Sequence, residues 1–225
     1  MTAAYRTASW IAGLLLVLAA AAPARAQGRP PAPATSPATP LRGAVTVDVG
    51  LLRMSAGRSF DALFDQATAT VLGGGADLVI GDRLWAAVRI SRATWDGERA
   101  FVDDGRVFRL GIPLSVRLVP VEISAGYRLV NRSPFTPYFG GGLGFHRYTE
   151  TSSFADASED VEETFSGYHV LGGVEGRLRR LVRVAGEVQW TRVPDALGGD
   201  GSVGAAFGES GLGGTAVRAK LLIGR

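Results

Sequence analysis

Two histidines, His146 and His169, are the side chains of this sequence best suited to acid–base catalysis at neutral pH. A histidine that activates a serine needs the hydroxyl within hydrogen-bond reach and a carboxylate that orients the ring. The residues from His146 onward read HRYTE and include no serine, and Ser152, Ser153 and Ser166 lie in or beside a predicted loop. The pattern therefore predicts no catalytic residue, and we expect both histidines in the wall or the lumen of the fold.

Metal and cofactor chemistry has equally little support. The chain has no cysteine, which excludes disulfides, thiolate metal sites and cysteine catalysis, and two imidazoles alone are too few ligands for a metal site. The segment SSFADASEDVEET, residues 152–164, contains five carboxylates. It could bind calcium or a basic partner weakly, but a solvated loop tip is the simpler interpretation. We predict no metal, no cofactor and no enzyme activity.

Ten charged residues fall on one face of predicted strands, because successive side chains of a strand point to opposite faces. In VEISAGYRL, residues 121–129, Glu122 and Arg128 lie on the face opposite Val121 and Ile123. The second face of most such segments is nearly free of charge. The charged set is Asp48, Asp77, Arg89, Glu122, Arg128, Glu175, Arg177, Glu187, Arg218 and Lys220.

About eight segments of this kind follow residue 42, and the connections between them alternate in length. Short turns at one end and long loops at the other are typical of a transmembrane up-and-down barrel. The predicted fold of residues 43–225 is therefore all-β, an eight-stranded antiparallel up-and-down transmembrane β-barrel. The short turns are predicted at 81–82, 131–136 and 179–181, and the longer polar segments at 55–67, 96–106, 149–165 and 194–211.

A barrel of eight strands has an interior only wide enough to be filled by side chains. Charges of both signs in such a lumen must pair, because an unpaired buried charge is very costly. In PYFGGGLGFHRYTE, residues 137–150, the glycines fall largely on the inner face and leave room for long side chains. We expect Tyr138, Phe139, Phe145 and Tyr148 near the two ends of this strand, where aromatic girdles form.

The segment RVFRLGIPLSVRLVP, residues 106–120, makes the fourth strand unusually long and contains Pro113 and Pro120. We interpret it as an extension of that strand beyond the membrane, with a bulge at Pro120 that shifts which face points inward. A separate short edge hairpin is the alternative.

The N-terminus predicts export. Arg6 precedes the apolar run WIAGLLLVLAAAA, and Ala24-Arg25-Ala26 forms a small-x-small cleavage site, so residues 1–26 are predicted to be a signal peptide. The run is shorter than the ~20 residues of a spanning helix. Residues 27–42 are rich in proline and predicted to be a disordered linker. Cleavage removes Arg6 and Arg25 from 24 basic residues and leaves 22 against 21 acidic ones, which gives no indication of a nucleic-acid partner.

Two segments resemble the small bacterial outer-membrane β-barrel proteins of the OmpA/OmpX and OmpW-like superfamily. SPFTPYFGGGLGFHRYTE is similar to their turn and fifth strand, with its Pro-Tyr-x-Gly-x-Gly-x-Gly run, and GGVEGRLRRLVRVAGEVQWTRV is similar to a later pair of strands. The resemblance implies a monomer in the outer membrane, with membrane lipid, the assembly machinery and periplasmic chaperones as partners. The chain departs from the pattern at its end, which reads LLIGR where such barrels usually end in an aromatic residue.

The sequence thus predicts an integral outer-membrane barrel with a structural or surface-interaction role, a charged and largely closed lumen, and exposed loops that could bind a surface ligand. A narrow OmpW-like channel for small solutes is the alternative. A soluble, lipocalin-like periplasmic carrier is a third hypothesis, and the lipid-facing apolar bands argue against it.

Overall fold

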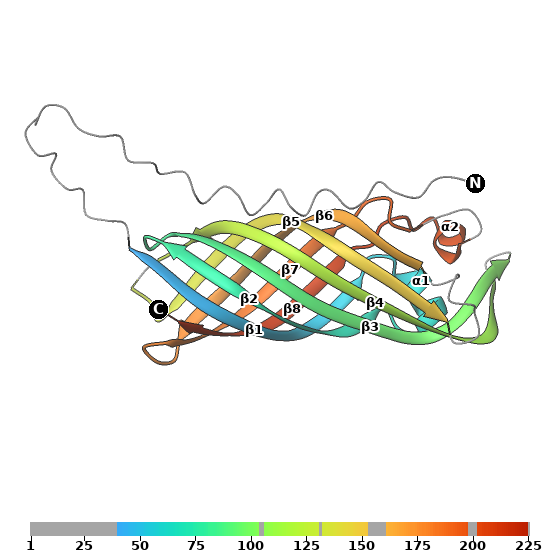
Figure 1. Ribbon diagram of the computed structural model, residues 1–225, viewed down its shortest axis with the longest axis horizontal. Helices are drawn as coiled ribbons and strands as arrows, with labels where there is room; N and C mark the ends of the chain where they lie inside the picture. Colours follow the sequence, from blue (N-terminus) through green and yellow to red (C-terminus); the bar gives the residue numbers. More distant parts are fainter. Residues whose placement is uncertain (1–39, 104–105, 131, 153–160, 198–201, 225) are drawn as a thin grey trace, which may run out of the picture. The chain divides into compact units, whose positions relative to one another are not determined.

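The computed structural model describes residues 40–103, 106–130, 132–152, 161–197 and 202–224, which form one closed antiparallel barrel (Figure 1). Each strand pairs with the next in the chain, and the eighth pairs with the first, so the predicted eight-stranded fold is confirmed. The strands are β1 (Leu41–Met54), β2 (Thr68–Ile80), β3 (Leu84–Asp103), β4 (Arg106–Arg128), β5 (Phe135–Ser152), β6 (Val161–Arg177), β7 (Val182–Arg192) and β8 (Gly214–Gly224).

The predicted signal peptide lies outside the described residues, as does most of the predicted linker, whose last two residues belong to β1. Neither helix in the described part of the chain is long and apolar enough to cross a membrane.

Alternation along each strand separates an apolar outer face from a mixed inner face. In β1, Val45 and Val47 are 65% and 53% exposed, whereas Thr46 and Asp48 beside them are buried. The same alternation exposes leucine, isoleucine and valine around the whole barrel. A continuous apolar belt of this kind is unfavourable in water and suits the hydrocarbon region of a bilayer.

The strands are strongly staggered and therefore tilted, as Figure 1 shows. A path of register partners that starts at Ala44 and passes once round the barrel returns to β1 at Met54. The two ends of this path are ten residues apart along β1. The path runs Ala44, Asp77, Ala87, Ser124, Gly142, His169, Thr191, Gly214 and Met54.

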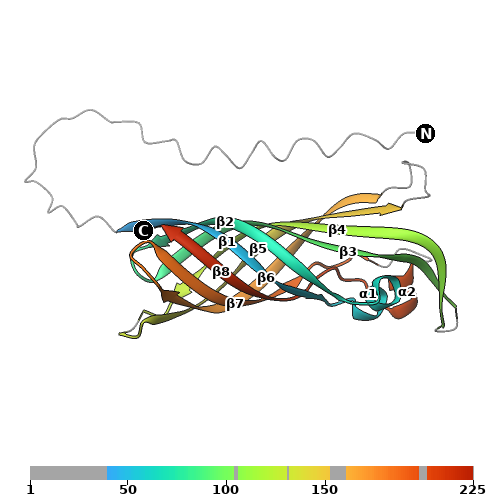
Figure 2. The ribbon, with the colours of Figure 1, turned by 90° about the horizontal axis from the view of Figure 1, so that it is seen from below.

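The two ends of the barrel differ. Short turns join the strands at the end where β1 begins and β8 ends. At the other end, α1 (Gly57–Phe64) lies between β1 and β2, and α2 (Val203–Phe207) lies between β7 and β8. Figure 2 shows the two helices side by side there, next to the long β3–β4 hairpin. We call these the short-turn end and the helix end.

The predicted bulge at Pro120 is wrong, and so is the alternative of a separate hairpin, because β4 is one continuous strand. The β3–β4 pairing is interrupted between Ile90↔Val121 and Ala93↔Leu118 but resumes in the same register. Proline removes a ladder donor without moving its neighbours to the other face. The irregularity lies instead near Gly111, which has a φ of 67° opposite a register shift at Glu98.

The predicted positions of two aromatics also need correction. Phe139 and Phe145 point outward and are exposed, but Tyr138 is buried in the lumen and Tyr148 is half-buried there. Alternate residues of β5 point to the same face, and both tyrosines alternate with the outward-facing residues in the same way as the inward-facing His146. Tyr138 packs edge-on against Trp85, with ring centroids 5.8 Å apart.

Candidate functional site

Five carboxylates and five cations occupy the middle of the lumen and its short-turn end, so their formal charges cancel. All ten come from inward-facing strand positions and are buried or half-buried. Nine of them belong to the predicted lumen charge network. The carboxylates are Asp48, Asp77, Glu122, Glu175 and Glu187, and the cations are Arg89, Arg128, Arg183, Arg218 and Lys220.

Glu187 is the centre of this lumen network. One carboxylate oxygen lies 2.8 Å from a guanidinium nitrogen of Arg89, and the other accepts hydrogen bonds from Lys220 at 3.1 Å and from the Tyr138 hydroxyl at 3.0 Å. Asp48 lies between Arg89 and Arg218, each with Nε 3.6 Å from a carboxylate oxygen. Every carboxylate oxygen of Glu187 therefore faces a cation, as a buried charge requires.

Register brings several of these opposite charges together directly. Arg89 is the partner of Glu122 across β3 and β4, and Glu187 is the partner of Arg218 across β7 and β8. Asp48 is the partner of Lys220 across β1 and β8. Opposite charges at facing positions stabilise one register over a slipped one.

Gln189 bridges a carboxylate and two guanidinium groups of the network. It was not among the predicted site residues. Its amide nitrogen donates to Glu122 at 2.6 Å, and its carbonyl oxygen accepts from Arg218 at 2.6 Å and from Arg89 at 3.3 Å. Its inward position, two residues after Glu187, could have indicated the role.

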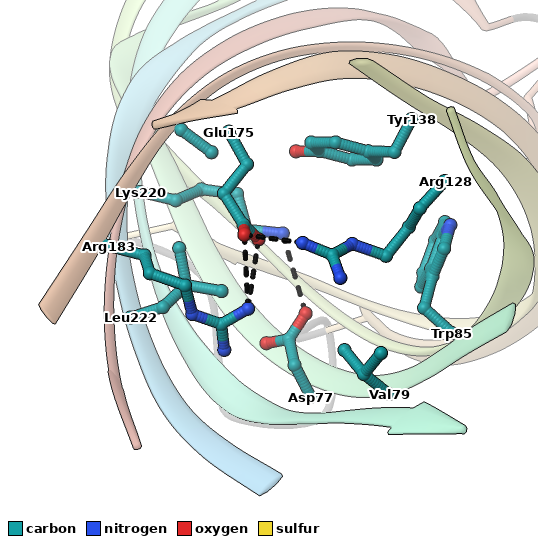
Figure 3. Close-up of a pocket in the computed structure, with 10 residues that line it drawn as sticks. Asp77, Val79, Trp85, Arg128, Tyr138, Glu175, Arg183, Lys220 and Leu222 are labelled. Carbon is teal, nitrogen blue, oxygen red and sulfur yellow. Dashed lines mark hydrogen bonds and ion pairs between the residues drawn. The ribbon is translucent and has the colours of Figure 1, made fainter. Parts of the chain in front are cut away.

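Figure 3 shows the network at the short-turn end. Glu175 accepts from Arg128 at 2.6 Å and from Arg183 at 3.1 Å, and Lys220 lies 3.8 Å from Asp77. The cavity among these side chains measures about 20 Å³, which is room for about one water molecule.

Arg177 does not join the network, contrary to expectation. It is exposed at the end of β6 and makes no ion pair with any residue in the described ranges. Its register partner is Arg183, so two like charges face each other and only Arg183 reaches Glu175. A sequence pattern places both arginines on the inner face but does not show which one turns inward.

We expect Arg183→Gln to lower the free energy of unfolding by about 1–2 kcal/mol, because Glu175 loses a charge-assisted hydrogen bond. Arg177→Gln is the matched control and should change stability by less than about 0.5 kcal/mol. Urea unfolding in detergent micelles measures both, and equal effects would contradict the assignment.

The two histidines occupy the lumen wall. His169 Nε2 lies 2.8 Å from Ser124 Oγ, and its Nδ1 lies 3.7 Å from Glu122. Gly142 stands between Ser124 and His169 in the register, so no side chain separates them. The order of groups is that of a hydrolase triad, but the histidine–carboxylate distance is too long for a hydrogen bond. Ser124 is only 7% exposed and His169 2%, so the hydroxyl is closed to a substrate.

The sequence did not indicate Ser124, because this serine lies far from both histidines along the chain. The barrel brings this serine from β4, two strands away from His169 on β6. Most of the acidic segment that could have bound calcium, residues 153–160, lies outside the described residues.

No family model and no curated protein matches this sequence. Solved structures do match. The crystal structure of Neisserial surface protein A superposes with a TM-score of 0.52 at 17% sequence identity, over 81% of this chain and 96% of that one. This chain has the fold of the small outer-membrane β-barrels. Lower similarity links it to Ail, the attachment invasion locus protein of Yersinia pestis (TM-score 0.49, 8% identity, 81% and 97% coverage). The N-terminal barrel domain of Pseudomonas aeruginosa OprF follows (0.43, 11%, 80% and 97%).

In outer-membrane barrels the short turns face the periplasm and the longer connections face outward. By this rule, we expect the helix end of the present barrel to be the extracellular one. Apolar side chains fill its lumen there, and Phe60 of α1 packs against Trp95 and Phe64 at ring centroid distances of 5.1 and 5.3 Å. The remaining buried members of this apolar plug are Leu52, Met54, Ala56, Ala67, Ala69, Val71, Ala93, Leu114, Val116, Leu118, Val193, Leu212 and Ala216.

Polar contacts hold α1 over the plug. Glu209, just after α2, accepts hydrogen bonds from the backbone N–H and the hydroxyl of Ser59 at 2.9 and 2.7 Å, and from the N–H of Arg58 at 3.2 Å. Burial opposes ionisation of Glu209, but these hydrogen bonds outweigh it and lower its pKa. Arg109 of the β3–β4 hairpin pairs with Asp65 at the end of α1, and this hydrogen bond lowers the pKa of Asp65.

A carboxylate with a lowered folded-state pKa stabilises the folded state at neutral pH, and this contribution is lost as the pH falls through the folded-state pKa. We therefore expect acidification through that range to loosen α1, and Glu209→Gln to do so at neutral pH. Hydrogen exchange of the Ser59 amide, corrected for intrinsic rate, should accelerate about tenfold, which corresponds to about 1.4 kcal/mol. The exposed Asp61→Asn change in α1 is the control. An unchanged Ser59 rate in Glu209→Gln would contradict this role.

Proposed function

We propose that this protein is an outer-membrane anchor with a closed lumen, and that it acts through the surface it displays at the extracellular end. The observation that supports the proposal is the series of packed layers along the lumen in the described part of the chain. The apolar plug lies outermost, the charge-balanced network lies in the middle, and Trp85 and Tyr138 pack beside a one-water cavity towards the periplasm.

A channel for small solutes would need a continuous aqueous path. Unpaired charges of one sign would keep water in such a path. The positive and negative charges of the lumen network are instead equal in number and lie within hydrogen-bond or ion-pair distance of each other. Charges that pair with one another leave less for a passing ion to bind. We therefore favour a closed lumen over the channel alternative.

The extracellular end has the features of a contact surface. The apolar plug and the contacts of Glu209 and Arg109 give α1 and α2 a fixed position. A cleft of about 280 Å³ beside them is lined by apolar side chains such as Phe60 and Leu63 and by polar ones that include Ser59, Arg99 and Glu150. Ordered apolar surface at a membrane-distal end supports a role in binding rather than in transport.

Single cysteines test the display of this end, since the chain has none of its own. Ala206→Cys in α2 and Asp82→Cys in the β2–β3 turn both replace exposed residues. On intact cells, a membrane-impermeant maleimide should label Ala206→Cys and leave Asp82→Cys unlabelled, and both should react after lysis. Labelling of Asp82→Cys alone on intact cells would contradict the proposal.

A further inference from the structure

Five arginines project from the outer face of the barrel just beyond the apolar band, on the helix-end side. All are exposed, and each shares its face with lipid-facing residues, as Arg53 does with Leu51 and Arg92 with Ile90. The five, which we call the arginine belt, are Arg53 of β1, Arg92 of β3, Arg117 of β4, Arg147 of β5 and Arg192 of β7.

The stagger of the barrel brings these arginines to nearly one level. One circuit of register partners returns to β1 ten residues nearer the helix end. A line drawn round the barrel at constant height therefore moves towards the short-turn end by just over one residue at each of the eight strands. Along such a line the five positions lie within about 8 Å of each other in height, because a tilted strand rises roughly 2.4 Å per residue along the barrel axis. The other three strands present exposed hydroxyl residues at this level, namely Thr70, Ser166 and Thr215.

The belt lies where the bilayer changes from hydrocarbon to headgroups. Phe145 and the Tyr168–Trp190 pair, with ring centroids 6.1 Å apart, are exposed on the barrel at the edge of the belt nearest the apolar band. Aromatic side chains of this kind mark the membrane interface. The belt is therefore level with lipid headgroups, at the boundary of the hydrocarbon.

Most of the belt has no anion within the protein. Arg147 pairs with Glu162 at 2.6 Å. Among the described residues, the side chains of Arg53, Arg92, Arg117 and Arg192 make no ion pair or hydrogen bond. The outward-facing acids nearby, Asp96 and Glu162, lie farther from the apolar band.

We propose that the arginine belt binds the phosphate groups of lipid headgroups in the outer leaflet. A guanidinium forms bidentate hydrogen bonds with phosphate, and several around one circumference can hold a ring of lipids. The site goes beyond the extracellular surface proposed above and does not depend on a closed lumen, but it rests on the proposed orientation, in which the helix end faces outward.

The test uses a variant with Arg53→Gln, Arg92→Gln, Arg117→Gln and Arg192→Gln. The matched control removes the same charge elsewhere through Arg106→Gln, Arg132→Gln, Arg179→Gln and Arg180→Gln, all exposed positions. Heat-modifiable gel migration first establishes that each variant is folded. A fluorescent bisphosphorylated lipid A is then titrated into each protein in zwitterionic micelles, and energy transfer from tryptophan reports binding.

We expect binding to weaken at least tenfold in the belt variant and less than threefold in the control. Equal affinity of the belt variant and the wild type would overturn the proposal, and so would an equal loss in the control. A repeat with inorganic phosphate as competitor distinguishes the source of the ligand. Displacement of the lipid by millimolar phosphate would mean a free-anion site and would also overturn it.

Discussion

Glu187→Leu should destabilise the barrel by about 3–5 kcal/mol or prevent folding, because it leaves Arg89 and Lys220 without their closest anion. The Tyr138 hydroxyl also loses its acceptor. The lumen would then hold five cations against four carboxylates. Urea unfolding in micelles or vesicles, followed by tryptophan fluorescence, measures the loss.

Two further variants separate charge balance from packing. Val188→Ala removes a neighbouring lipid-facing side chain and should cost much less, since it leaves the lumen unchanged. Glu187→Leu combined with Lys220→Met restores equal numbers of charges and should recover part of the stability. If Glu187→Leu unfolds at the wild-type urea concentration, the network does not stabilise the fold.

The second large effect is expected at Gly142. A Cβ on this residue would lie 1.9 Å from the carbonyl oxygen of Ile123 and 2.8 Å from Cα of Ser124, and backbone cannot move aside as a flexible side chain can. Gly142→Val should therefore destabilise by at least about 3 kcal/mol, at the upper end of overpacking effects.

Gly186→Val is the matched control for this substitution. It also introduces valine into a strand, but no atom lies within 4 Å of the added Cβ. The loss of the heat-modifiable folded band on gels should be confined to Gly142→Val. A folded Gly142→Val protein of normal stability would show that β4 and β5 can separate at this point.

Much of the fold follows from the period of two in the sequence. Charges on alternate positions, such as Glu122 and Arg128, indicated an inner face, and the uncharged face of the same strand indicated lipid. The same parity should have assigned Tyr138 to the lumen, but its apparent place at a strand end favoured a girdle instead. Local pattern was the better guide there.

Other features depend on contacts between distant segments and could not be predicted. The choice between Arg177 and Arg183 depends on the register of β6 against β7. The meeting of Ser124 with His169 depends on two registers and an intervening glycine. The arginine belt becomes level only after the stagger of the whole barrel is known. The bulge predicted at Pro120 was wrong because a strand can lose one ladder hydrogen bond without a bulge.

Single-channel recording tests the central claim, a lumen closed by packing and paired charges. The refolded, heat-modifiable mature protein should give no steady openings in planar bilayers, and Arg128→Ala, which removes one ion pair beside a one-water cavity, should also remain silent. Steady openings of the wild type whose conductance changes in Arg128→Ala would mean that ions pass through the lumen, and would contradict the account.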